Sequence, residues 1–286
     1  MAVPMERLRR RLLGPLFDRL GYDLVPATPD WAHRPLSQPE VDRLLDAATA
    51  RLGADLEAAG LAGPPDLSAL VAEFWALIPN APVRQRRGGS GFNGALQLFV
   101  LMRVLEPDFV IESGVFRGLT TWVIRQARPE AAIFCHDPDL SGLRYRDARA
   151  RYCDRDWSAA DWSGLDPRRT VAFFDDHVAQ ARRVAEARER GLTRLVFDDD
   201  ACAHRIHAHG GPAHPTIAMV LERRASPEPI RWQRNGRIFE QPAADPLLRR
   251  AARLIARAHA FDDLHRATGY APARLTYVQL HPESGA

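Results

Sequence analysis

The stretch PDFVIESGVFRGLTTWVIRQARPEAAIFCHDPD, residues 107–139, decides the fold. It contains two short apolar runs, Asp108–Ser113 and Ala131–Cys135, each of which has the character of a buried parallel strand. Between them, a glycine-containing turn leads into Leu119–Ala127, where apolar residues recur at helical spacing. Strand, turn, helix and second strand form one unit of a doubly wound α/β sheet. We therefore expect a pocket of the adenosine-binding type at the carboxyl edge of this sheet.

The turn after the first strand has the spacing E-x-G-x-x-x-G, from Glu112 to Gly118. Gly114 and Gly118 would let the backbone approach a ligand where a Cβ atom would collide. A dinucleotide site instead uses G-x-G-x-x-G beside a helix N-terminus that holds the pyrophosphate. A carboxylate at Glu112 would repel a diphosphate and suits a cationic or amino-bearing ligand. Asp137, after the second strand, lies close to the roughly 20-residue offset typical of a ribose-binding acid.

The composition is that of a globular protein. The chain has 286 residues, 46% of them hydrophobic, and no apolar run reaches the roughly 20 residues needed to span a bilayer. The 39 basic residues are all arginine and the net charge is only +3, so nucleic acid is not an expected partner. Three scattered cysteines, and arginines where a secretory signal would be apolar, favour a cytoplasmic location.

Amphipathic helices are expected before the sheet. Met5–Leu20 is basic, and such a helix packs on its own domain or makes peripheral contact with a membrane or an acidic partner. Glu40–Ala59 and Leu67–Ile78 have similar periodicity, and this helical region could serve as a homodimer surface. The glycine-rich stretch Gln85–Gly94 either closes over a pocket or acts as a hinge, and Asn93 is a candidate pocket residue.

Three more strands are expected after the opening unit. They are Ala150–Cys153, Thr170–Phe174 and Thr193–Phe197. The last two end in acidic clusters, which comprise Asp175, Asp176 and His177 after one strand and Asp198, Asp199 and Asp200 after the other. Carboxylates at one edge of a sheet repel one another unless a cation or strong donors hold them. Short carboxylates suit Mg²⁺ or another hard divalent ion.

In order and spacing, the segments VIESGVFRG, FFDDH and RLVFDDD resemble the class I S-adenosylmethionine-dependent methyltransferases, within them the metal-dependent macrocin O-methyltransferase and cephalosporin-hydroxylase-like group. The resemblance covers residues 92–200 and weakens where Ala201-Cys202-Ala203-His204 replaces the usual start of a substrate loop. It implies a Rossmann-like, seven-stranded, mostly parallel sheet with helices on both faces. Residues 1–84 would form a helical extension, and residues 85–286 the methyltransferase domain, with a substrate cap at about 201–245.

The resemblance also implies cofactor-binding residues. The strand-end acid and the glycine turn would line the methionine part of S-adenosylmethionine, through Glu112, Gly114, Phe116 and Gly118. Asp137 would hold the ribose hydroxyls. Asp156 and Trp157 would contact the adenine, although Asp156 could instead cap a helix or lie in solvent.

The resemblance further implies a Mg²⁺ site and a catalytic pair. Asp176, Asp199 and Asp200 would bind the cation, with Asp175 and Asp198 as supporting or alternate ligands. Besides binding the cation, Asp176 would act in catalysis with His177. The cation would lower the pKa of an acceptor hydroxyl, and the imidazole would take its proton. A histidine at a helix start could instead bond to the backbone.

The expected reaction is therefore methyl transfer to a hydroxyl of a sugar or glycan or of another small-molecule natural product, with a catechol as the next choice. Two alternatives remain open. One is an NAD- or nucleotide-dependent sugar-modifying enzyme, and the other is a non-catalytic protein that binds the cofactor or a partner. Amino-methylation of DNA is disfavoured because FFDDH lacks the proline and aromatic residue of a D/N-P-P-Y/F motif.

The C-terminal third holds further signals. Cys202–His214 contains four of the ten histidines, and it either binds zinc or forms a wall of the substrate site. Asn235-Gly236 predicts a hairpin between two short strands. Asp245-Pro246 is a typical helix start, and we expect a helix with inward-facing residues as far as Ala258, ended by Gly269. Leu275–Leu280 is expected to be the last strand.

Overall fold

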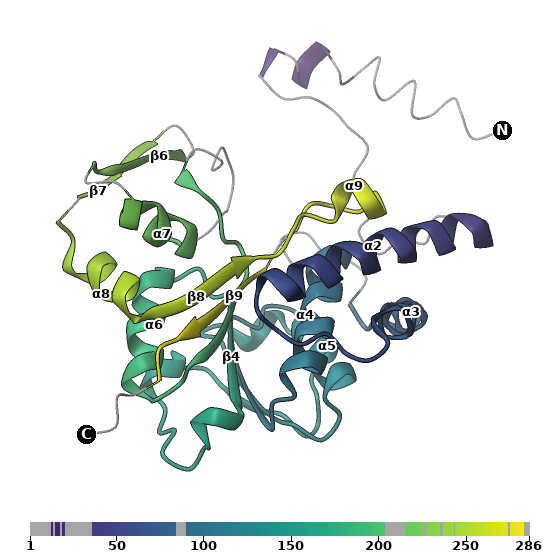
Figure 1. Cartoon of the computed structure of the whole chain (residues 1–286), viewed down its shortest axis with the longest axis horizontal. Helices are drawn as coiled ribbons and strands as arrows, with labels where there is room; N and C mark the ends of the chain where they lie inside the picture. Colours follow the sequence, from purple (N-terminus) through teal and green to yellow (C-terminus); the bar gives the residue numbers. More distant parts are fainter. Residues whose placement is uncertain are drawn as a thin grey trace.

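The computed structural model describes residues 36–83, 90–203 and 215–282, except 226–227, 235–236, 243 and 274, and also residues 13, 15–17, 19 and 20. The main sheet contains β1 (Phe109–Ser113), β2 (Ala132–His136), β3 (Arg151–Cys153), β4 (Thr170–Phe174), β5 (Arg194–Phe197), β8 (Ile255–Ala260) and β9 (Thr276–Leu280). Their order is β3-β2-β1-β4-β5-β9-β8, and β9 is antiparallel to both its neighbours whereas β1 to β5 are parallel (Figure 1). This sheet confirms the expected Rossmann-like α/β class.

Helices cover both faces of the sheet (Figure 1). They are α2 (Gln38–Ala58), α3 (Leu67–Leu77), α4 (Phe92–Leu105), α5 (Leu119–Ala127), α6 (Gln180–Glu189), α7 (Ile217–Ala225), α8 (Pro246–Leu254) and the short α9 (His265–Thr268). Helices α2 to α5 share one hydrophobic cluster on one face, and α6 to α8 share another on the opposite face. The helices expected at Glu40–Ala59 and Leu67–Ile78 are therefore present as α2 and α3, and they complete the core on this face.

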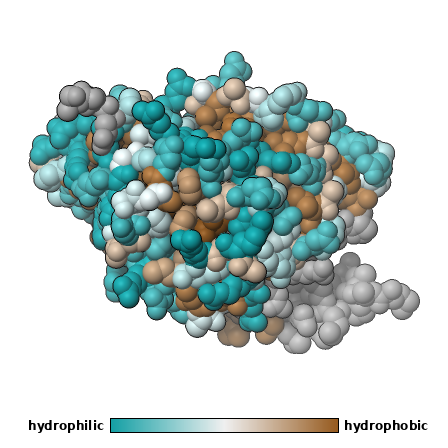
Figure 2. Space-filling view, turned by 90° about the horizontal axis from the view of Figure 1, so that it is seen from below, coloured by the Kyte–Doolittle hydropathy of each residue, from teal (hydrophilic) through white to brown (hydrophobic). Residues whose placement is uncertain are grey.

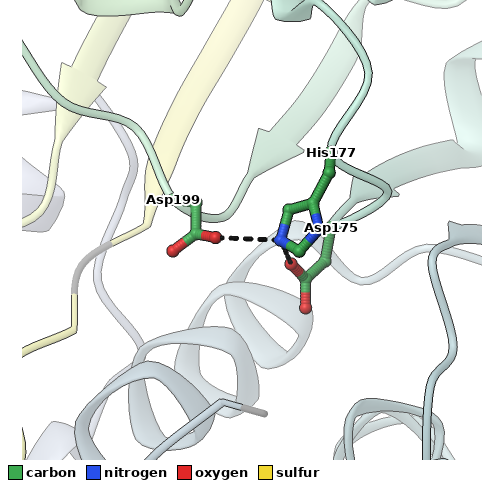
Figure 3. A group of neighbouring side chains, drawn as sticks. All are labelled: Asp175, His177 and Asp199. Atoms are coloured by element: carbon green, nitrogen blue, oxygen red, sulfur yellow. Dashed lines mark hydrogen bonds and ion pairs between the residues drawn. The ribbon is translucent and has the colours of Figure 1, made fainter. Parts of the chain in front are cut away.

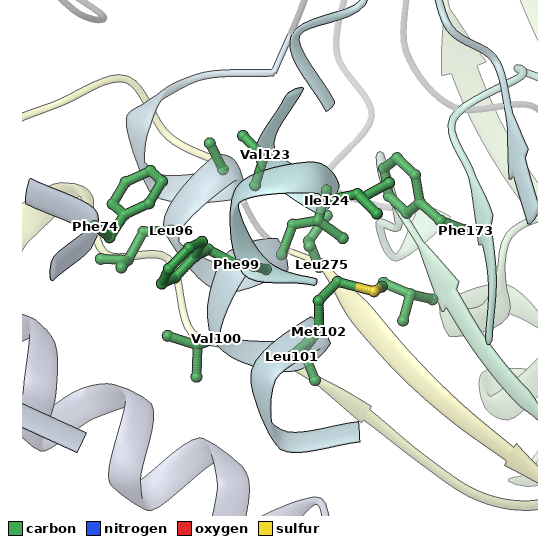
Figure 4. Packing of buried hydrophobic residues seen from close by; sticks show 14 of the residues in the cluster. Phe74, Leu96, Phe99, Val100, Leu101, Met102, Val123, Ile124, Phe173 and Leu275 are labelled. Atoms are coloured by element: carbon green, nitrogen blue, oxygen red, sulfur yellow. The ribbon is translucent and has the colours of Figure 1, made fainter. Parts of the chain in front are cut away.

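The central strands are buried on both sides. Val171 and Phe173 of β4 belong to the cluster of α4 and α5, whereas Ala172 and Phe174 belong to the cluster of α6 and α8. This follows from the twofold alternation of side chains along a strand. Figure 4 shows the first cluster, where Phe99 lies among aliphatic side chains of α4 and its neighbours. The continuous apolar character of the run is thus that of a strand covered by helices on both faces.

One expected element is wrong. The helix that starts at Asp245 ends at Leu254, and the chain passes directly into β8 instead of remaining helical as far as Ala258. The arginine- and alanine-rich run has a high helix propensity, but pairing with β9 and the burial of Ile255 outweigh it. At the same strand, His259 Nε2 lies 2.8 Å from Asp55 Oδ1 of α2. The edge strand is therefore attached to the N-terminal helices.

A two-stranded antiparallel sheet follows α7. It consists of β6 (Ile230–Arg234) and β7 (Arg237–Gln241), so the expected hairpin strands are present. Most of Met5–Leu20, as well as residues 84–89 and 204–214, lie outside the described residues, and so do the predictions made for them. Among the described helices, none combines the length and apolar character needed to cross a bilayer. Figure 2 shows a face that is mainly hydrophilic, with smaller hydrophobic areas between.

Candidate active site at the carboxyl edge of the sheet

The turn after β1 packs tightly against other backbone. Gly114 has φ of 90°, and a Cβ atom there would lie 2.2 Å from the carbonyl oxygen of Asp175. Gly118 has φ of 87°, and its Cβ atom would lie 2.3 Å from the carbonyl oxygen of Tyr145. Real Cβ atoms do not approach other atoms this closely. Both glycines are therefore required by the protein's own backbone, before any ligand is considered.

Asp137 lies beside this turn, as the sequence suggested. Its Oδ2 atom accepts hydrogen bonds from the amides of Val115 and Phe116, at 2.8 and 2.9 Å. Its Oδ1 atom accepts one from the amide of Asp139, at 2.9 Å. The carboxylate thus fixes the turn, and a ribose bound here would share these oxygens with the backbone.

Glu112 lies beneath the turn and is fully buried. The hydroxyls of Thr120 and Thr121 donate to its two oxygens at 2.5 and 2.6 Å, and the Cys135 thiol donates at 3.3 Å. Burial raises the pKa of Glu112 to about 7, against the lowering effect of these hydrogen bonds. In this structure the carboxyl anchors α5 to β1, and its contact with the methionine part of a cofactor stays a prediction.

A small cavity opens between the turn and the end of β4. It is lined by Val83, Ser90, Val115, Phe116, Arg117, Leu119, Thr120 and Asp175. Phe116 is 44% exposed at its rim and has a positive φ of 49°, which is uncommon for an aromatic residue. This cavity is the place where the described residues could hold a cofactor. Phe116 borders it as expected, whereas Asn93 is fully buried and bonds to Ala271 and Thr268.

The expected adenine contacts are arranged differently. Asp156 caps the short helical turn Trp157–Ala159 through the amide of Ser158, and both its oxygens bind Arg183 at 3.1 and 2.6 Å. Although burial opposes ionisation, these bonds hold the pKa of Asp156 well below its usual range. Trp157 has no exposed surface and packs against Phe174 in the second cluster. Both side chains therefore have structural partners, and the Trp157 ring offers no face to a nucleobase.

Asp175, His177 and Asp199 form a cluster at the strand ends (Figure 3). Potential ligand atoms of the three side chains all lie within 4.8 Å of one another. His177 Nε2 is 3.2 Å from Asp199 Oδ2 and 4.0 Å from Asp175 Oδ1. His177 and Asp199 have positive φ values of 56° and 57°, and strained backbone of this kind concentrates at functional sites. Two carboxylates and an imidazole fit a divalent cation.

The expected ligands Asp176, Asp199 and Asp200 differ in part from the members of this cluster. Asp176 Oδ2 accepts hydrogen bonds from Ser113 at 2.6 Å and from Arg183 at 2.9 Å, so this oxygen already has two partners. Asp200 binds the amide of Ala218 at 2.9 Å and the hydroxyl of Thr276 at 2.6 Å. Of the three expected ligands, only Asp199 belongs to the cluster.

Asp198 is buried next to the cluster and binds the backbone of Asp199. It accepts hydrogen bonds from the Ser90 hydroxyl at 2.9 Å and from the amide of Asp199 at 2.7 Å. Burial and the charge of Asp199 raise the pKa of Asp198 to about 7. Burial also raises the pKa of Asp175, and the charges of Asp198 and Asp199 add to the effect. These carboxyls compete for ionisation, as expected for acids that share a site.

Arg183 is a central residue that the sequence analysis did not single out. Its side chain is 2% exposed and binds Asp156, Asp176 and Glu186. It thereby ties the segment after β3, the end of β4 and α6 together. Its position seven residues after Asp176 on an amphipathic helix was the only sequence signal, and an arginine there more often faces solvent.

Several solved structures of methyltransferases are similar to the chain. A Klebsiella pneumoniae protein assigned as an O-methyltransferase matches over 97% of this chain and 99% of its own, with 13% identity and a TM-score of 0.44. The Streptomyces achromogenes O-methyltransferase TomG, in complex with S-adenosylmethionine, matches over 80% and 96%, with 15% identity and a TM-score of 0.41. A Bacillus cereus O-methyltransferase in complex with S-adenosylhomocysteine matches over 81% and 99%, with 13% identity and a TM-score of 0.38.

At these identities the likeness concerns the fold. By name, all three proteins belong to the class of enzyme that the sequence motifs resemble. No protein-family model and no curated protein sequence matches the chain.

Proposed function

We propose that this chain is an S-adenosylmethionine-dependent O-methyltransferase that uses a divalent cation. One observation carries the proposal: Asp175 both lines the cavity beside the β1 turn and belongs to the cluster with His177 and Asp199. A methyl donor in the cavity would therefore adjoin an acceptor held at the cluster. The sequence resemblance supports the same assignment.

For methyl transfer, the main task of the protein is to align the methyl donor with the acceptor. In an in-line displacement the methyl group leaves the sulfonium for the acceptor oxygen, so donor and acceptor must be held close and collinear. A bound divalent cation would lower the pKa of the acceptor hydroxyl. Asp175 and Asp199 would hold the cation, and Phe116 and Asp137 would border the donor. The positive charge of the sulfonium suits a cavity that ends at carboxylates.

The acceptor that we propose is a hydroxyl of a sugar or of a small-molecule natural product. This part rests on the sequence resemblance. A vicinal diol is the simplest such group, because two adjacent oxygens can bind one cation together.

Titration calorimetry of the full chain with S-adenosylhomocysteine, with and without Mg²⁺ or Mn²⁺, tests the proposal. We expect micromolar binding of the nucleoside, and cation binding that is lost in Asp199→Ala. Asp46→Asn, an exposed carboxylate on α2, serves as the control and should bind the cation as the wild type does. Absence of nucleoside binding under every condition, or binding of NAD in its place, would contradict the proposal.

A further inference from the structure

His177 lies between two carboxylates from different strand ends (Figure 3). The same ring nitrogen, Nε2, faces both Asp199 and Asp175, at 3.2 and 4.0 Å. The side chain is 58% exposed, so the hydrophobic core does not hold it in this position. Its φ of 56° lies in the left-handed region, which residues other than glycine adopt infrequently. His177 Nε2 and one carboxylate oxygen each of Asp175 and Asp199 therefore lie close enough together to bind one cation.

Carboxylates that could complete an all-oxygen site are engaged elsewhere. Asp176 is held by Ser113 and Arg183, and Asp200 by Thr276 and the amide of Ala218. Asp198 is buried and binds Ser90 and the amide of Asp199. Within the described part of the chain, the ligand set at this edge is therefore two carboxylates and one imidazole.

We infer that His177 is itself a metal ligand, through Nε2, and that it makes the site selective for Co²⁺ over Mg²⁺. Imidazole nitrogen suits transition metal ions, whereas Mg²⁺ prefers carboxylate, carbonyl and water oxygens. The inference rests on the proposed function, which supplies the need for a cation. It also changes the role of His177, because a lone pair directed at a cation cannot accept the proton of the acceptor hydroxyl.

The substitution His177→Glu changes the type of ligand but not the number of ligands. Its side chain has the reach of the histidine Nε2 atom and replaces nitrogen with a hard oxygen. We expect the ratio of Co²⁺ to Mg²⁺ affinity to fall by about 10- to 100-fold, since softer ions lose the preferred donor and Mg²⁺ does not. His281→Ala, an exposed histidine just after β9, is the matched control for stray imidazole binding and should leave the ratio unchanged.

The direct test is pulsed electron paramagnetic resonance of the metal-stripped full chain reloaded with one equivalent of Mn²⁺. We expect a ¹⁴N coupling from a directly bound imidazole, present in the wild type and in His281→Ala and lost in His177→Glu. A wild-type spectrum without nitrogen coupling would overturn the inference, as would a coupling that survives in His177→Glu. An unchanged Co²⁺ to Mg²⁺ ratio in that variant would also overturn it.

The proposed function is tested separately on the same samples. Binding of S-adenosylhomocysteine to the metal-stripped chain depends on the cavity and not on the imidazole. Nucleoside binding without nitrogen coupling would leave the methyltransferase proposal standing and remove the ligand role of His177. Nitrogen coupling without nucleoside binding would support the ligand role of His177 and contradict the methyltransferase proposal.

Discussion

The backbone at Gly114 touches the backbone at Asp175 so closely that a Cβ atom on the glycine would lie 2.2 Å from the aspartate's carbonyl oxygen. The two residues follow neighbouring parallel strands, β1 and β4. One belongs to the turn beside the cavity and the other to the acidic cluster. This contact therefore fixes the distance between the two halves of the candidate active site.

Gly114→Ala should disturb both halves at once. The positive φ and the collision with Asp175 together should lower the free energy of unfolding by about 2–4 kcal/mol. Denaturant unfolding measures this loss, and calorimetry should show weakened nucleoside and cation binding. Gly164→Ala is the control, because nothing lies within 4 Å of a Cβ atom there. Equal stability of the two variants would contradict the contact.

Asp175→Asn and Asp176→Asn should change stability in opposite directions. Asp175 carries an ionisation that burial and neighbouring acids oppose, so its neutral analogue should be more stable by about 0.5–2 kcal/mol at pH 7 while losing cation affinity. Asp176 binds Ser113 and the buried Arg183, so Asp176→Asn should cost about 2–3 kcal/mol. Thermal unfolding with and without Mn²⁺ measures both effects. The same sign in the two variants would show that the cluster is assigned to the wrong acids.

Arg183→Met should be among the most destabilising substitutions in the second half of the chain. It would leave Asp156, Asp176 and Glu186 without their shared cation, and breaking a buried charge network costs about 3–5 kcal/mol. Arg182→Met, one position away, removes an exposed ion pair with Glu186 and should cost less than about 1 kcal/mol. Urea unfolding of the two variants compares them directly. A small effect at Arg183 would mean that the network adds little to stability.

Glu112 should make stability depend on pH. Its folded pKa of about 7 lies above the ordinary value, so between about pH 4.5 and 7 the folded state binds more protons than the unfolded one. The free energy of unfolding should therefore fall as pH rises through this range, by on the order of 3 kcal/mol, and level off above it. Glu112→Gln should remove this contribution, because its amide does not titrate. The amide oxygen can still accept from one threonine hydroxyl, whereas the NH2 group can only donate to the other. Parallel pH profiles of wild type and variant would exclude a raised pKa.

The strands of this fold are readable from the sequence because they are buried on both faces. The five strands expected before residue 200 are present within one residue of their expected limits. β8 was missed because its helix-favouring run becomes a strand only through pairing with β9, and such pairing has no local signature.

The sequence predicts acidic side chains at this edge of the sheet, but it does not show which of them lie together. Consecutive side chains at a strand end point in opposite directions, so the choice between Asp175 and Asp176 depends on partners that the sequence does not reveal. Arg183 and Ser113 donate hydrogen bonds to Asp176, and Thr276 donates one to Asp200. The burial of Trp157 could not be predicted for a similar reason. It depends on tertiary packing against helix α6 and strand β4.

The link between Asp55 and the C-terminal strand has a consequence for biosynthesis. Asp55 of α2 lies 2.8 Å from His259 Nε2 and accepts the amide of Asp262 at 3.0 Å, across 204 and 207 positions of chain. Because a ribosome makes the N-terminus first, Asp55 lacks these two partners until almost the whole polypeptide has emerged. In a nascent or truncated chain that stops before β8, this acid and the part of α2 beside it stay uncovered, and proteases and chaperones can distinguish such a chain from the finished molecule.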